Sequence, residues 1–166
     1  MWIFIIIVIA VALVVGPAMM MRPSPAQKNK ARLRALALAK NIRVTVRNLP
    51  QQPTESEKPA PLPVYFIAPA DHQLNDDWFL LRASYAHKIH FLDFWAWQGN
   101  LRATAAEQAT LQKYLPVLPE SVRGVSVGSK GVCVYWQERG GDQVLLQIIE
   151  LLEVLNALQI RPKEQV

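Results

Sequence analysis

The sequence predicts an α/β protein of the two-layer α+β kind, preceded by a transmembrane helix. Three observations predict it. Residues 2–21 contain no charged side chain. Short apolar–polar alternations typical of strands recur between residues 42 and 136. A capping box indicates a helix at 105–115, and apolar seams of helical spacing indicate another at 143–159. Strands and helices in this order favour a mostly antiparallel sheet with helices on one face.

Residues 1–21 are expected to form the transmembrane helix. The run from Trp2 to Met21 is uncharged throughout, and a helix of this length spans about 30 Å, which is the thickness of a bilayer core. A signal peptide would need a basic segment before the run and a small-residue cleavage site after it, and the sequence shows neither. The alternative interpretation is a buried helix of a soluble core, which rarely has so long an uncharged run.

Residues 22–41 are expected to form a basic amphipathic helix beside the membrane. Ser24 is suited to cap it, and Pro25 is suited to its first position, where no N–H is needed. Residues 22–49 carry eight Lys and Arg and no Asp or Glu, whereas residues 50–166 carry ten against thirteen. The net charge of +5 therefore comes from this one basic segment.

The basic segment predicts both orientation and a lipid contact. Lys and Arg beside a membrane span stay on the cytoplasmic side, so we expect a single-pass protein of a bacterial inner membrane, with its N-terminus outside and its C-terminal domain in the cytoplasm. Membrane lipids are the expected partner of residues 2–40. The side chains expected at anionic headgroups are Arg22, Lys28, Lys30, Arg32 and Arg34. One alternative is that the basic helix docks on an acidic protein or on ribosomal RNA. The other is specific nucleic-acid binding, which is disfavoured because the remainder of the chain is acidic.

Residues 42–160 are expected to form the α+β domain, followed by a tail at 161–166. A proline-rich loop is predicted at 50–63. The capping box from Thr104 to Glu107 begins the helix at 105–115. Strands are expected at 42–47, 64–68, 78–84 and 90–97, and a short helix is the alternative for 90–97. A hairpin is expected to turn at Gly128–Gly131. Its second strand would place Val132, Val134 and Trp136 on one face and Cys133 and Tyr135 on the other.

The helix predicted at 143–159, with Asp142 as its N-cap, has two apolar seams. A sheet face can cover one seam, and the second needs further cover. The second seam, formed by Leu145, Ile149 and Leu152, is the candidate contact for a partner protein or for self-association. The alternative is that the helix is simply well buried in its own domain. The aromatic residues on the predicted strands also have two interpretations. They form either a packed core or a partly exposed binding surface.

The sequence assigns no catalytic residue, no cofactor and no metal ligand. His87, His90 and Asp93 could share a metal only on a helix, and the local pattern favours a strand or loop. Cys133 in mid-strand is expected to be a buried small residue. Glu138 and Arg139 are expected to be a solvated pair. The enzyme hypothesis is an unrecognised site between Asp71 and His90.

One weak resemblance concerns the first part of the chain. The residues that carry it are Arg22-Pro23, Gln27-Lys28, Lys30, Arg32 and the strand from Ile42. Residues 2–47 resemble the YajC-type accessory subunit of the Sec translocon, and the resemblance implies an auxiliary role near a membrane machine without catalysis. The sequence as a whole predicts a non-catalytic adaptor or accessory subunit at the membrane. The alternatives are the YajC-like factor of a translocase and the membrane-anchored enzyme.

Overall fold

The structure is a computed structural model, and it describes residues 1–20, 24–51, 59–69 and 77–160. The chain divides into two compact units, Met1–Arg32 and Leu33–Val166. The predicted α+β class is confirmed for the second unit, which holds a six-stranded antiparallel sheet. The residues at 161–166 and most of the predicted proline-rich loop lie outside the described residues.

The first unit contains helix α1, Trp2–Met20, and the beginning of helix α2, Pro25–Ala39. The large apolar side chains described in α1 are 54–82% exposed. Within the described part of the chain, however, no helix is both long and apolar enough to cross a membrane, so the spanning role of residues 1–21 stays a prediction. The predicted cap of α2 is present: the Ser24 N–H donates to Gln27 Oε1 at 2.9 Å, and the Gln27 N–H donates to Ser24 Oγ at 3.2 Å.

The second unit is built on a sheet with the strand order β1-β2-β6-β5-β3-β4. Every pair of neighbouring strands is antiparallel. Strand β2 begins at Leu62, inside the predicted proline-rich loop. The strands are β1 Arg43–Arg47, β2 Leu62–Ile67, β3 Trp78–Arg82, β4 Trp95–Gln98, β5 Val122–Gly128 and β6 Gly131–Trp136.

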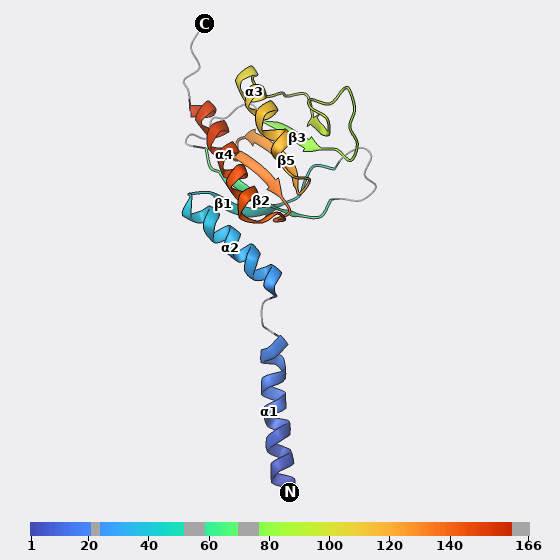
Figure 1. Cartoon of the computed structure of the whole chain (residues 1–166), viewed down its shortest axis with the longest axis vertical. Helices are drawn as coiled ribbons and strands as arrows, with labels where there is room; N and C mark the ends of the chain where they lie inside the picture. Colours follow the sequence, from blue (N-terminus) through green and yellow to red (C-terminus); the bar gives the residue numbers. More distant parts are fainter. Residues whose placement is uncertain (21–23, 52–58, 70–76, 161–166) are drawn as a thin grey trace. The chain divides into compact units, whose positions relative to one another are not determined.

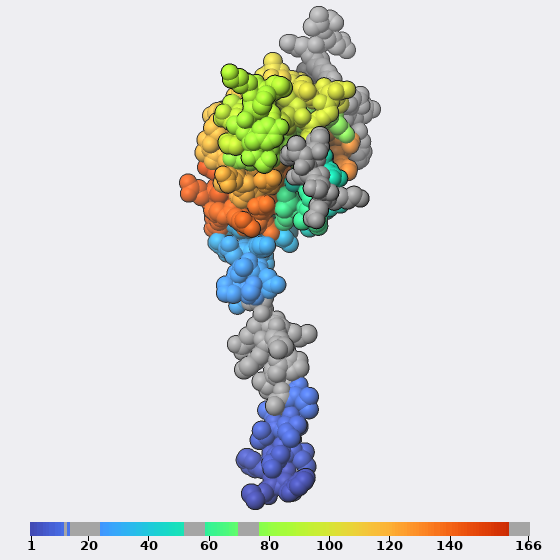
Figure 2. Space-filling view, turned by 90° about the vertical axis from the view of Figure 1, so that its right-hand side faces the viewer, coloured from blue at the N-terminus to red at the C-terminus, as the bar shows by residue number. Residues whose placement is uncertain are grey.

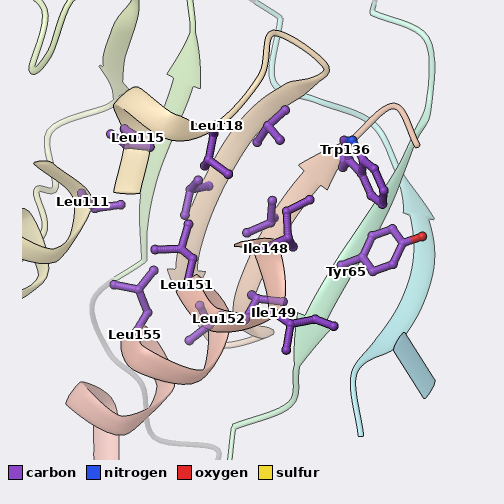
Figure 3. Packing of buried hydrophobic residues seen from close by; sticks show 14 of the residues in the cluster. Tyr65, Leu111, Leu115, Leu118, Trp136, Ile148, Ile149, Leu151, Leu152 and Leu155 are labelled. Carbon is purple, nitrogen blue, oxygen red and sulfur yellow. The ribbon is translucent and has the colours of Figure 1, made fainter. Parts of the chain in front are cut away.

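The helices of this unit cover one face of the sheet, as the sequence predicts (Figure 1). They are the end of α2, then α3 at Ala105–Tyr114 with the 3-10 turn η1 at Leu115–Val117, and α4 at Gly141–Ile160. Figure 3 shows Ile148, Leu151, Leu152 and Leu155 of α4 packed toward the strands, with Tyr65 and Trp136 beside them. One large core between the helices and the sheet therefore holds this unit together.

The hairpin of β5 and β6 is confirmed, and so is the division of its side chains between two faces. Val132, Val134 and Trp136 belong to the large core under the helices. Cys133 and Tyr135 belong to a separate small cluster on the opposite face. The capping box is also confirmed, because the Glu107 N–H donates to Thr104 Oγ1 and the Thr104 N–H donates to the Glu107 carboxylate at 2.6 Å.

Two local predictions are wrong. Residues 90–97 form neither a long covered strand nor a helix, because a tight turn occupies their middle: the Trp95 N–H donates to the Leu92 carbonyl at 2.7 Å, and Asp93 has a φ of +44°. Only Trp95–Gln98 forms a strand. Asp142 is not the N-cap of the last helix, because α4 begins at Gly141 and Asp142 lies in its first turn. The carboxylate can still interact favourably there with the helix dipole.

Candidate functional site

The predicted partner residues of the last helix lie in the core. Leu145, Ile149 and Leu152 are 1%, 6% and 0% exposed, and Figure 3 shows the latter two among the packed side chains. The prediction that they contact a partner is therefore corrected in favour of the alternative, a helix well buried in its own domain. The cover that their seam required comes from the same chain, because α3 packs against α4.

The predicted lipid-facing cations separate into two groups. Lys28, Lys30 and Arg32 have exposed side chains in the first unit, and Arg22 lies outside the described residues. Arg34 departs from the prediction, because its guanidinium is paired with a carboxylate of the second unit. Its Nε and Nη2 donate to the two carboxylate oxygens of Glu138, at 2.6 and 2.9 Å.

Glu138 is the acceptor of a buried polar cluster that the sequence did not reveal. Its side chain is fully buried, and the Tyr65 hydroxyl donates to it at 3.2 Å. The hydrogen bond to Glu138 raises the pKa of Arg34, and burial together with the charge of Glu138 raises the pKa of Tyr65. The expected solvated pair of Glu138 and Arg139 is therefore wrong. The backbone of Glu138 turns in the left-handed region, with a φ of +57°, which directs the chain away from the strand.

The residues of the enzyme hypothesis are only partly described. Asp71 and Asp76 lie outside the described residues, and Asp77 accepts a hydrogen bond from the Ser129 N–H at 2.7 Å. His87 and His90 occupy a turn, and their ring centroids are 5.9 Å apart. Among the described residues, no group of three or more His, Cys, Asp or Glu is placed to hold a metal ion.

The loop at 84–94 is the most exposed aromatic segment of the second unit. Tyr85, Ile89 and Phe94 are 50%, 86% and 41% exposed. Figure 2 shows this part of the chain, in yellow-green, on the surface. The tryptophans, in contrast, are mostly core residues, because Trp78, Trp95 and Trp136 are at most 3% exposed.

The face of the sheet opposite the helices carries a second apolar cluster, which we call the open face. Arg47 lies over it: the guanidinium carbon is 4.9 Å from the centre of the Phe66 ring, and Nη1 donates to Cys133 Sγ at 3.3 Å. The rings of Phe79 and Tyr135 pack at 5.0 Å. Burial raises the pKa of the Cys133 thiol, which keeps it protonated. The open face consists of the half-buried Leu49, Phe66 and Phe79 and of the buried Val64, Cys133 and Tyr135, which support them.

Two hollows border the open face, and Pro50 lines both. The first has a volume of about 270 Å³ and is lined by Arg47 and Lys130, among others, near the turn of the hairpin. The second has a volume of about 290 Å³ and is lined by Arg82 and Arg123, near the other end of the same strands. Cationic side chains thus stand at both ends of an apolar, aromatic surface.

Comparison with known proteins adds no relative to this picture. A scan against protein-family models, a search of curated proteins and a search of solved structures each found no match. We therefore infer function from the residues alone.

Proposed function

We propose that the protein is a membrane-tethered, non-catalytic adaptor whose α+β domain binds another protein through the open face. The observation that carries the proposal is the composition of this face. The half-buried rings of Phe66 and Phe79 lie beside Arg47, and the buried ring of Tyr135 packs against Phe79. Within the described residues the helices pack on the other side of the sheet. Aromatic residues and arginine are the residue types enriched at the centres of protein–protein interfaces.

The tether is proposed from the uncharged run at residues 2–21 and from the exposed cations that follow it. The side chains of Lys28, Lys30 and Arg32 are exposed, and a basic side chain near an anionic bilayer surface contributes about 1 kcal/mol of attraction. The proposed setting is a bacterial inner membrane that the chain crosses once, with the domain in the cytoplasm. An auxiliary role at a membrane translocase is one form of this function and rests on the resemblance of residues 2–47.

Site-specific photocrosslinking in intact cells tests the adaptor role. We would place benzoylphenylalanine at Phe66, which is half-buried on the open face, and at Leu146, which is 59% exposed on α4. A protein partner of the open face gives one discrete adduct from position 66 that is missing from position 146. The same adduct should weaken when Arg47 is replaced by Gln. Adducts of equal strength from both positions, or none from position 66, would contradict the proposal.

Membrane extraction tests the tether separately. The full-length chain should stay with the membrane fraction in alkaline carbonate. Replacing Ile7 and Val8 by Lys should release it, because charged side chains are costly at the centre of a bilayer. The matched control replaces Ile89, an 86% exposed residue of the second unit, by Lys. Extraction of the unchanged chain by carbonate would contradict the tether.

A further inference from the structure

Two arginines of neighbouring strands meet beside the second hollow. Arg82 ends β3, and Arg123 is the second residue of β5, which pairs with β3. The pairing of β5 with β6 shifts register between Val122 and Gly124, so Arg123 is the extra residue of a β-bulge. A bulge redirects the side chain of its extra residue, and bulges are over-represented next to functional sites.

Arg82 is held firmly in place. Its Nη1 donates to the carbonyl oxygens of Leu118 and Pro119, at 3.2 and 3.1 Å. Its guanidinium carbon also lies 5.4 Å from the centre of the Trp95 ring and 5.9 Å from that of Phe94. The positive charge of Arg82 is therefore a fixed part of the surface.

Arg123 has a different environment. Its side chain is half-buried, and within the described residues it forms no hydrogen bond and no ion pair. It lies close enough to Arg82 to repel it: burial lowers the pKa of Arg82, the charge of Glu120 raises it, and the charge of Arg123 lowers it again. A bound anion beside Arg123 would relieve the repulsion between the two guanidinium groups.

The space around Arg123 is open to a ligand. Arg123 lines three separate hollows, with volumes of about 290, 510 and 140 Å³. The first of them is also lined by Leu49, Leu62 and Leu81. A ligand at this position would therefore meet a cation and an apolar wall together.

We infer that Arg123, with Arg82 beside it, binds the carboxylate of an acidic segment of the partner protein, and that an aliphatic neighbour of that carboxylate fills the hollow of about 290 Å³. This inference rests on the proposed adaptor function and names the chemistry of its partner. A guanidinium offers paired donors that match the two oxygens of a carboxylate. A phosphate group would bring a charge of about −2, and the carboxylate of Glu120, which acts on Arg82, would repel it more strongly than it repels a single carboxylate.

Peptide titration of the full chain in detergent micelles tests the inference. The probes are acetyl-Leu-Glu-Leu-amide, the matched acetyl-Leu-Gln-Leu-amide, and inorganic phosphate. The readout is the Nε–Hε NMR signal of Arg123, assigned by its loss in Arg123→Lys. We expect the Glu peptide to shift this signal and to bind about tenfold more tightly than the Gln peptide, because the charge-assisted hydrogen bonds are lost with the carboxylate. Equal affinities, or tighter binding of phosphate, would overturn the inference.

Variants separate this site from the rest of the protein. Arg123→Gln should abolish the preference for the Glu peptide, whereas Lys113→Gln, which removes a cation from α3, should keep it. An unchanged amide spectrum away from β5 shows that Arg123→Gln is folded. If the crosslink from position 66 persists unchanged in Arg123→Gln, the adaptor role stands and the carboxylate assignment fails. If the peptide binds but position 66 gives no adduct, the adaptor role fails instead.

Discussion

Arg34→Met tests whether the buried cluster at Glu138 holds α2 to the domain. The substitution keeps most of the aliphatic stem and removes the guanidinium that donates to both carboxylate oxygens. Among the residues that the structure describes, Glu138 would then keep only the Tyr65 hydroxyl as a side-chain partner, in a site where its own side chain is fully buried. The variant should therefore leave a buried charge without its counter-ion.

The expected loss follows from the exposure of the two partners. Removing one member of a buried ion pair costs about 3–5 kcal/mol. The Arg34 side chain is 44% exposed, so water can reach part of the space that it leaves, and the loss should fall to about 2–3 kcal/mol. Glu138→Gln should cost less, about 1 kcal/mol, because the half-exposed Arg34 can then turn to water.

Urea unfolding of the full chain in detergent micelles, followed by tryptophan fluorescence, measures these losses. With a denaturant dependence of about 1.5 kcal/mol per molar urea, Arg34→Met should lower the midpoint by about 1.3–2 M. The double variant Arg34→Met/Glu138→Gln should be close to Glu138→Gln alone, because no buried charge is then left without a partner. A loss below about 0.5 kcal/mol for Arg34→Met, or simple additivity of the two substitutions, would refute the reasoning.

Three further predictions concern the domain. Glu107→Ala should lower the free energy of unfolding by about 2–3 kcal/mol in the same urea assay, because it removes both the capping box and the acceptor of the Trp78 indole N–H at 3.1 Å; a loss below about 1 kcal/mol would contradict this. Gly131→Ala should cost at least about 2 kcal/mol, because φ is +88° and a Cβ would overlap a carbonyl oxygen of β2, whereas Gly99→Ala, at φ +73° with open space around it, should cost about 1 kcal/mol. Cys133 should react with iodoacetamide about 100-fold more slowly at pH 8 in the native protein than in urea, because burial raises the pKa of its thiol and the thiolate forms only at higher pH; equal rates would contradict its burial.

Features encoded within a few residues were predictable from the sequence. The capping box of Thr104 and Glu107 needs only neighbouring side chains and backbone, and the hairpin at Gly128–Gly131 needs only its turn and two alternating runs. The turn that ends at Trp95 was missed because its left-handed residue is Asp93 and not a glycine. The apolar run at 90–97 does not show at which residue strand pairing with β3 begins.

Features that depend on distant residues were not predictable. Arg34 and Glu138 are 104 residues apart, and neither lies in a pattern that identifies the other. The second seam of α4 was assigned to a partner because the sequence does not show which element covers it. In the structure, Leu111 and Leu33 lie in the same core and supply cover from within the chain. The bulge at Arg123 depends in the same way on how β5 and β6 pair.

The ion pair of Arg34 also has a consequence for the order in which the chain is made. Synthesis proceeds at about 5–20 residues per second, so α2 leaves the ribosome about 5–20 s before Glu138, its partner 104 residues later. For most of that interval the apolar side chains of Leu33 and Ala37 have no complete core to enter, because β6 is made only at its end and α4 follows after it. A newly made α2 is then a basic helix with an uncovered apolar stripe, which is the form that binds membrane surfaces. Completion of the domain buries Leu33 and Ala37 and pairs Arg34 with Glu138, so these three side chains are no longer available to such a surface.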